Sequence, residues 1–247
     1  MDIKLNKNNK QVIVLFLSTI IGVLLGVVSS VLNTRSLDAI NYGDVRYVQN
    51  LINLFSCVFL LGFFVSGSRL LALSKDAEYN RGIKGVMVRY LMITILLMSL
   101  VLVCLYFFHR IYRTSFDASL FLISIPVCAQ PLMLNYINTT SQGDNQITQI
   151  ALARLLPAFI YVIVAYIVYN CFSVTSSLMI LLQWGIACVV FIIIISSTKP
   201  QFSNYPKYRK LLNEENKSYG IHLYFGSLAM VATQYISGVT LGIFRVY

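Results

Sequence analysis

Long apolar runs dominate the chain and restrict its fold more than any other feature. A run of about 18 or more residues with few charges is long enough to cross a bilayer. Only 11% of the 247 residues are charged, against about 25% in an ordinary soluble domain. Backbone groups in lipid must bond within their own segment, and the connections between the runs are short. The sequence therefore predicts an all-α, polytopic membrane helix bundle of six helices, plus a seventh that starts a second bundle. The runs lie at about 12–32, 47–68, 86–108, 117–138, 147–169 and 175–196, with a more polar seventh at about 220–244.

The connection at 199–218 suggests how the chain is divided. It carries Pro200, Pro206 and mixed charge, which is typical of a linker with at most one surface helix. We predict an N-terminal six-helix transmembrane bundle over 1–198, a cytoplasmic linker over 199–218, and the first helix of an incomplete second bundle over 219–247. The first run is longer than the 7–15 residues of a signal-peptide core, so we interpret it as a retained helix.

The net charge of +10 follows the connections between spans. Twelve of the 19 Lys and Arg residues fall in the N-terminal tail and in the connections near 69–84 and 199–217, whereas five fall on the opposite side. Cytoplasmic loops are enriched in Lys and Arg, so the pattern predicts a cytoplasmic N-terminus. This distribution explains the basic charge without a nucleic-acid partner.

Small residues and prolines interrupt the apolar runs. Ser18, Gly22, Gly26 and Ser30 recur every fourth residue, a pattern that lets membrane helices approach closely, and we predict a packing face there. Pro126 and Pro131 fall within the fourth span and Pro157 within the fifth. Proline removes a helical hydrogen bond, so we expect the fourth span to be the most bent.

Motifs for catalysis or metal binding are absent from the sequence. It contains two histidines, no HExxH, no GxSxG and no glycine-rich phosphate loop. The five cysteines lie in apolar runs without a CxxC spacing, as expected for helix packing. The sequence predicts no enzyme, no catalytic residue, no metal site and no cofactor.

Polar residues inside the spans are the candidate site. Asn50 and Asn53, three residues apart on the second span, share a helix face that can bond sugar hydroxyls or a neighbouring helix. Arg154 lies about 10 Å into the fifth span, where it can bind an anion or snorkel to the interface. Arg35 ends the first span near Asp38. None of the nine acidic residues lies deep in a span, so an anionic substrate fits better than a cationic one.

Four stretches, in order, resemble the bacterial polysaccharide (O-antigen) flippases, within the superfamily that also contains multidrug and toxin extruders. "NTRSLDAINYGDVRYVQNLINL" resembles the first outer turn of that family, and "LGFFVSGSRLLALSKD" the end of its second helix. "SQGDNQITQIALARLLPAFIYVIVAY" resembles the fourth-to-fifth turn, and "SYGIHLYFGSLAMVATQYISGVTLGIF" the start of the seventh helix. The matching positions are Arg35, Leu37, Gly43, Tyr47, Gly62, Arg69, Gly143, Arg154, Tyr219, Gly220, Ser227 and Leu228.

The resemblance implies a function in surface polysaccharide (O-antigen or capsule) biosynthesis at the bacterial inner membrane. Its expected substrate is an undecaprenyl-diphosphate-linked oligosaccharide, with membrane lipid and other polysaccharide-assembly proteins as further partners. On this hypothesis Arg35 and Arg154 contact the diphosphate, and Asn50 and Asn53 contact sugar hydroxyls. Family members look about twice as long, so we expect a truncated chain.

Three other classes stay open at this point. A multidrug-type antiporter of the same superfamily would be expected to carry a carboxylate in its first helix, which is missing. A membrane-embedded polysaccharide polymerase or acyltransferase would need His, Asp or Arg clustered on a substantial outer loop. A passive assembly subunit would use the glycine stripe for packing.

Overall fold

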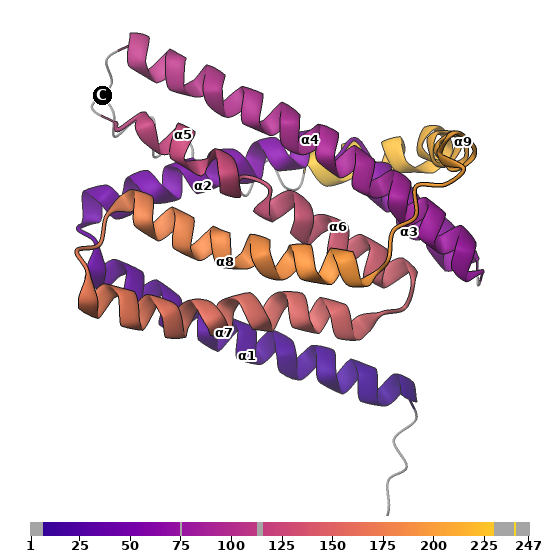
Figure 1. The fold of residues 1–247 in the computed structure, drawn as a ribbon, viewed down its shortest axis with the longest axis horizontal. Coiled ribbons are helices and arrows are strands. Elements are labelled where there is room, and N and C mark those ends of the chain that lie inside the picture. The colour runs from indigo at the N-terminus through magenta and orange to yellow at the C-terminus, as the bar shows by residue number, and fades with distance from the viewer. Residues whose placement is uncertain (1–6, 75, 113–115, 230–239, 241–247) are drawn as a thin grey trace, which may run out of the picture.

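The computed structural model describes residues 7–74, 76–112, 116–229 and 240, and every regular element within these ranges is helical. Figure 1 shows the helices lying roughly side by side. The α-helices are α1 (Lys7–Ser36), α2 (Ala39–Phe59), α3 (Phe63–Leu73), α4 (Ala77–Ile111), α5 (Ser119–Ser124), α6 (Gln130–Gly143), α7 (Ile147–Cys171), α8 (Ser176–Ser197) and α9 (Tyr205–Glu215). A 3₁₀ turn, η1 (Ile125–Val127), lies between α5 and α6, and a π-helix, η2 (Asn216–Gly220), follows α9.

Five helical segments are long and apolar enough to span a membrane, and the α2–α3 pair makes a sixth if it counts as one bent span. This confirms the predicted polytopic helix bundle. The predicted seventh span is described only at its start, where residues 221–229 are helical. The rest of that span, residue 240 excepted, lies outside the described residues.

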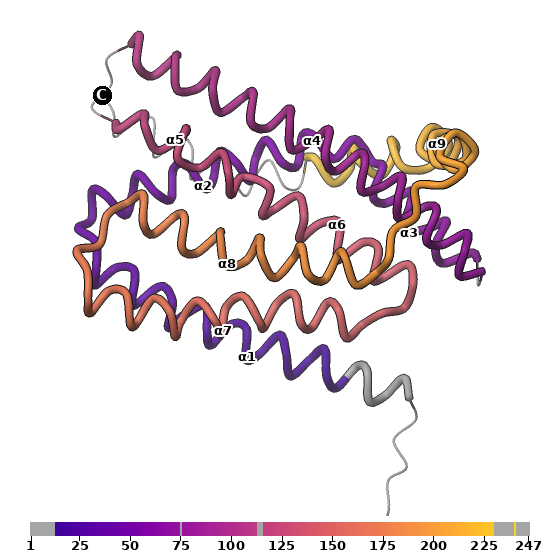
Figure 2. Tube along the Cα trace, viewed as in Figure 1, coloured from indigo at the N-terminus to yellow at the C-terminus, as the bar shows by residue number. Residues whose placement is uncertain are grey.

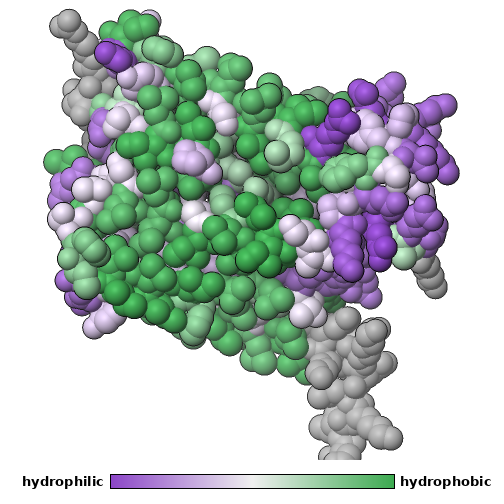
Figure 3. Space-filling model, viewed as in Figure 1, coloured by the Kyte–Doolittle hydropathy of each residue, from purple (hydrophilic) through white to green (hydrophobic). Residues whose placement is uncertain are grey.

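The bundle has two distinguishable ends (Figures 1 and 2). The turns α1–α2 and α7–α8 meet at one end, which we call the turn end. Helix α9 crosses the other end, which we call the α9 end. Helix α1 packs along α7, α7 along α8, and α8 along α6. Figure 3 shows apolar side chains over the middle of the visible face and hydrophilic ones concentrated at the α9 end, as expected for a protein surrounded by lipid.

The sharpest bend lies in the second span and not in the fourth. Helices α2 and α3 meet at 58° across a short break at which Leu61 and Gly62 have φ angles of 46° and 77°. Pro126 does interrupt the fourth span, as the turn η1 between α5 and α6. The expectation that the fourth span is the most bent is therefore wrong, because the strongest break depends on a left-handed glycine and not on proline.

The connection after α8 carries the surface helix α9, which is held against α4. The ring of Tyr208 fills the space beside Gly82, where a Cβ would overlap it. The backbone N–H of Gln201 donates to the carbonyl of Arg81 at 3.0 Å. Arg89 lies 4.5 Å from the ring centre of Tyr205. The linker is therefore ordered where it is described, while the division into bundle, linker and second bundle stays a prediction.

A buried ion pair ties α4 to the α6–α7 turn. Lys84 Nζ lies 2.5 Å from Asp144 Oδ2, and the lysine side chain is only 4% exposed. Asn80 Nδ2 donates to the other carboxylate oxygen at 3.0 Å. The sequence placed Lys84 in a loop, but the structure places it inside α4, where Asp144 compensates its charge.

Lys84→Ala is expected to destabilise the protein by about 3 kcal/mol, because removing one partner of a buried pair leaves the other charge uncompensated. Thermal unfolding in detergent measures this as a fall of several degrees in the midpoint. Lys210→Ala is the matched control, since Lys210 pairs with Glu214 at 4.0 Å on an exposed surface. That variant should change little, and equal midpoints for the two variants would contradict the assignment.

Candidate functional site

Two adjoining cavities lie among α1, α2, α6, α7 and α8. Cavity A has a volume of about 560 Å³ and is bordered mainly by α1, α7 and α8. Cavity B has a volume of about 370 Å³ and is bordered mainly by α2 and α6. Both cavities lie between spans. Their linings include polar side chains, whereas a surface that faces lipid would be apolar. The residues that line both cavities are Arg46, Gln130, Leu134, Gln183 and Trp184.

Helix α1 borders cavity A with the stripe of small residues. Ser18, Gly22, Gly26 and Ser30 all line the cavity. Among the described residues, no atom lies within 4 Å of a Cβ added to Gly22 or Gly26. The expectation that these glycines permit close helix packing is therefore wrong. Their four-residue spacing does keep them on one face of α1, but that face borders cavity A instead of packing against another helix.

Arg46 forms the centre of the shared wall. Its Nε and Nη2 groups donate to the Tyr42 hydroxyl at 2.9 and 2.6 Å, and Nη1 donates to Gln49 Oε1 at 3.0 Å. Gln49 Nε2 donates in turn to Gln183 Oε1 at 3.1 Å, which links α2 to α8. Among the described residues these contacts use three of the five guanidinium N–H groups, so two remain for an anion.

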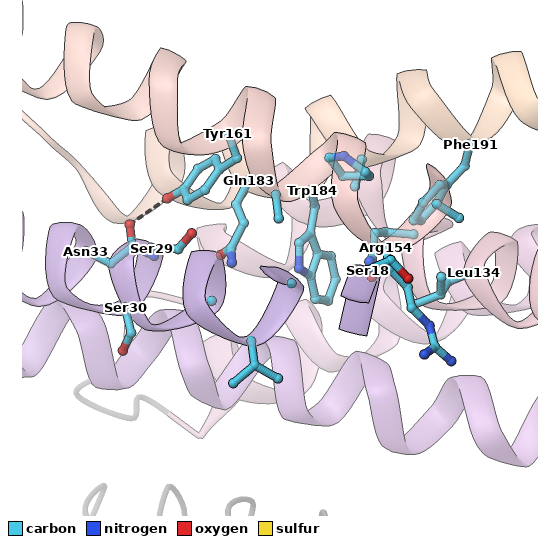
Figure 4. A pocket seen from close by; sticks show the side chains of 18 of the residues that line it. Ser18, Ser29, Ser30, Asn33, Leu134, Arg154, Tyr161, Gln183, Trp184 and Phe191 are labelled. Carbon is cyan, nitrogen blue, oxygen red and sulfur yellow. Dashed lines mark hydrogen bonds between the residues drawn. The ribbon is translucent and has the colours of Figure 1, made fainter. Parts of the chain in front are cut away.

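In a cluster of one amide and two phenols near the turn end, Asn33 and Tyr161 line cavity A, and Tyr169 lies within hydrogen-bonding distance of both. Asn33 Oδ1 accepts from the Tyr161 hydroxyl at 2.5 Å and from the Tyr169 hydroxyl at 3.3 Å, and the two hydroxyls are 2.9 Å apart. Asn33 is fully buried, and its Nδ2 has no partner within the described part of the chain. Figure 4 shows Asn33 and Tyr161 at one end of the cavity, Arg154 at the other, and Gln183 and Trp184 between them.

The four residues selected from the sequence occupy different positions. Arg154 lines cavity A, where its exposed guanidinium donates to the Thr19 hydroxyl at 3.1 Å. Asn53 lines cavity B. Asn50 and Arg35 line neither of the two cavities, and Arg35 is exposed at the end of α1. The structure thus brings Arg154 and Asn53 to the site and leaves Asn50 and Arg35 outside it.

Arg35 and Asp38 are not an ion pair in the described structure. Asp38 instead accepts a hydrogen bond from Asn41 Nδ2 at 2.5 Å, three residues further along the chain. Contact with substrate by any of the four residues stays a prediction.

Sequence reasoning missed the most central residues of the site. Arg46 counted as an outer-loop cation, although it lies three residues before Gln49 and seven before Asn53, on one face of α2. That spacing was a usable signal. No comparable signal marks Asn33, Gln183 or Trp184, because their importance depends on which helices become neighbours.

The lining chemistry favours an anion with hydroxyl groups. Arg46 and Arg154 supply positive charge, and neither cavity is lined by a carboxylate among the described residues. Amides and hydroxyls from the five helices α1, α2, α6, α7 and α8 supply donors and acceptors. In the same part of the chain no group of three or more His, Cys, Asp or Glu residues could hold a metal ion.

Fold and site together define a multi-pass membrane protein with arginine-lined cavities between its spans. The sequence profile of the polysaccharide biosynthesis protein family matches residues 9–245 of the chain. The chain therefore belongs to the polysaccharide biosynthesis protein family, which confirms the resemblance found in the sequence. Neither a curated protein nor a solved structure matches it.

Proposed function

We propose that this chain takes part in flipping a lipid-diphosphate-linked oligosaccharide repeat unit across the bacterial inner membrane, for surface polysaccharide such as O-antigen or capsule. The observation that carries the proposal is Arg46, which lines both cavities between the membrane spans. Membership of a polysaccharide biosynthesis family supports the pathway. The undecaprenyl-type lipid carrier and contacts with other assembly proteins belong to the same proposal.

The physical problem is to move charge and hydroxyl groups through hydrocarbon. An unpaired charge costs many kcal/mol in a medium that cannot hydrogen-bond it. Arg46 and Arg154 would bind the diphosphate, while Asn53, Gln183 and the Asn33 cluster would bond sugar hydroxyls. The lipid tail can remain in the bilayer. An inside-negative potential favours outward movement of an anion by about 2.3 kcal/mol per charge per 100 mV.

The orientation belongs to this proposal. The excess of Lys and Arg toward the α9 end supports a cytoplasmic N-terminus, with the turn end facing outward. Arg154 would then meet the substrate on the cytoplasmic side, and Asn33 on the outer side. Residues 1–198 would form one transmembrane bundle, 199–218 the cytoplasmic linker, and 219–247 the first helix of a second bundle.

The cavity lining helps to distinguish the proposed function from that of a multidrug-type antiporter and that of a polysaccharide polymerase. A cation-extruding antiporter needs an acidic group at its site, and the described lining of both cavities contains none. A polymerase needs positioned acid–base or nucleophilic groups. The arginine and amide chemistry fits binding better, so we assign the chain to transport and not to catalysis.

The direct test is complementation. Cells that lack the native protein should accumulate the lipid-linked repeat unit on the cytoplasmic leaflet and lose surface polysaccharide, and expression of the wild-type protein should restore it. Unchanged surface polysaccharide in the deletion strain would contradict the proposal, as would accumulation of unpolymerised units outside the membrane.

Arg154→Ala is expected to abolish export while the protein stays in the membrane. Its guanidinium is exposed in cavity A with one bond to Thr19, so its removal costs little stability. Immunoblotting of membranes and staining of surface polysaccharide measure the two quantities. Thr19→Val, which removes only the partner hydroxyl, is the control. Normal polysaccharide in the arginine variant would refute the role.

A further inference from the structure

Taken together as one bent span, α2 and α3 are interrupted by a break that exposes backbone carbonyls. At a helix end the last carbonyls lose their partners along the helix. Leu61 has φ = 46°, a conformation that is costly for a leucine, and Gly62 has φ = 77°. No water in the hydrocarbon region can bond such groups. The break therefore needs partners from elsewhere in the protein.

Those partners come from the segment 216–224, which we call the clamp. Asn216 Nδ2 donates to the carbonyl of Leu61 at 3.1 Å, and the Tyr224 hydroxyl donates to the carbonyl of Val58 at 2.7 Å. Ser66 Oγ, also within the span, lies 3.1 Å from the Gly62 carbonyl and 3.0 Å from Asn216 Oδ1. The clamp lies about 150 residues beyond the break in sequence, so the bend is not a local property of α2 and α3.

Two glycines allow this close approach. A Cβ on Gly62 would lie 2.5 Å from the carbonyl carbon of Gly220, and a Cβ on Gly220 would overlap Ser66 Oγ and Asn216 Oδ1. Asn216 is only 6% exposed. It begins the π-helix η2, a wider turn that is frequent at functional sites. The clamp and the break are therefore held together by close packing as well as by hydrogen bonds.

Charged contacts support the same interface from its edge. Arg69 Nη1 lies 2.7 Å from Glu215 Oε1, and its guanidinium lies 4.4 Å from the ring centre of Tyr219. Both contacts join α3 to the chain at or just before the clamp. These two contacts of Arg69 further fix the position of α3 against the clamp, where the other contacts come from glycines, Asn216 and hydroxyl groups.

We propose that the clamp holds the second span bent, and that its release lets α2 and α3 straighten toward one continuous helix. Asn53, Ser56 and Cys57 lie just before the break and line cavity B. Asn216 and Tyr224 are thus positioning residues, which act on the cavity through the break. The clamp follows the six spans in sequence. A movement of this segment would therefore change the bend between α2 and α3, and with it the shape of cavity B. The consequence for transport rests on the proposed function, whereas the bend itself does not.

The test is the distance between spin labels at Ile40 and Leu73, measured by double electron–electron resonance in nanodiscs. These side chains are 62% and 72% exposed, at opposite ends of the bent pair, and alanines replace the five native cysteines. At 1.5 Å per residue, straightening the 58° bend lengthens the separation by about 6 Å. Gly220→Ala should lengthen or broaden it, because the new methyl group displaces the clamp. Gly226→Ala is the matched control, since no atom of the described residues lies within 4 Å of a Cβ there.

Asn216→Ala gives the same readout with a smaller disturbance if Gly220→Ala does not reach the membrane. Its control is Asn213→Ala, which removes a bond to Tyr90 instead of one to the break. A longer or broader distance in Asn216→Ala, and in Gly220→Ala if that variant reaches the membrane, with both controls unchanged, supports the clamp. A wild-type distance in a folded Asn216→Ala protein overturns it. The measurement uses no transport assay, so its outcome is separate from that of the proposed function.

Discussion

Arg46→Ala should weaken binding of a lipid-diphosphate-linked oligosaccharide by roughly 10- to 100-fold, because each hydrogen bond to a charged group is worth about 1.5–3 kcal/mol. Arg46 borders both cavities, and within the described part of the chain two of its N–H groups stay available for an anion. Export should be lost with binding. Titration of the purified protein in nanodiscs with a short-chain prenyl-diphosphate oligosaccharide measures the dissociation constant.

The chain offers a matched control for this variant. Arg110 donates to the hydroxyl of Tyr106, four residues earlier, as Arg46 does to Tyr42. Arg110 lies outside cavities A and B. Arg110→Ala should leave affinity unchanged, and Arg46→Lys should recover part of it because an ammonium keeps the charge but not the planar geometry. Equal affinity for Arg46→Ala and Arg110→Ala would contradict the assignment.

Gly26→Leu is expected to block export with little effect on stability. The added side chain enters cavity A, where a Cβ at this position meets nothing within 4 Å. A leucine side chain occupies much of the space that a sugar would need. Surface polysaccharide and the thermal midpoint in detergent measure the two effects, and Gly22→Leu should behave alike.

Val27→Leu and Gly85→Ala are the two controls for Gly26→Leu: the first should be neutral and the second should lose stability. Val27 is 58% exposed, next to Gly26, and its replacement should change neither quantity. A Cβ on Gly85 would overlap the carbonyl of Gln201, so this variant should lose stability. If Gly26→Leu unfolds like Gly85→Ala, then α1 packs closely along its stripe and cavity A is not the site.

The spans and their order were predictable because the bilayer imposes length and apolarity on each segment separately. The same reasoning found Arg154 and Asn53, whose polarity is unusual within their spans. It selected Asn50 because Asn50 and Asn53 share a face three residues apart, but the lining face of α2 passes through Arg46, Gln49 and Asn53. A difference of one residue rotates a side chain by about 100° around a helix, which is enough to move it out of the cavity.

Features that depend on neighbours could not be read from the sequence. The stripe on α1 has the spacing of a packing motif, and only the placement of α7 and α8 shows that it borders a hollow. Likewise, the break at Gly62 requires partners about 150 residues away, which no local pattern reveals. Asn33 lines cavity A, and its hydrogen bonds to the hydroxyls of Tyr161 and Tyr169 depend on how α1 and α7 pack.

Cysteine labelling tests most directly whether α1 borders a water-filled, substrate-binding cavity. In a background without native cysteines, Gly26→Cys and Val27→Cys are treated in membranes with a membrane-impermeant maleimide, with and without the prenyl-diphosphate oligosaccharide. The account predicts that Gly26→Cys reacts, that the oligosaccharide slows this reaction, and that Val27→Cys stays unlabelled in lipid. Equal labelling of the two positions, or a rate at Gly26→Cys that the oligosaccharide leaves unchanged, would contradict it.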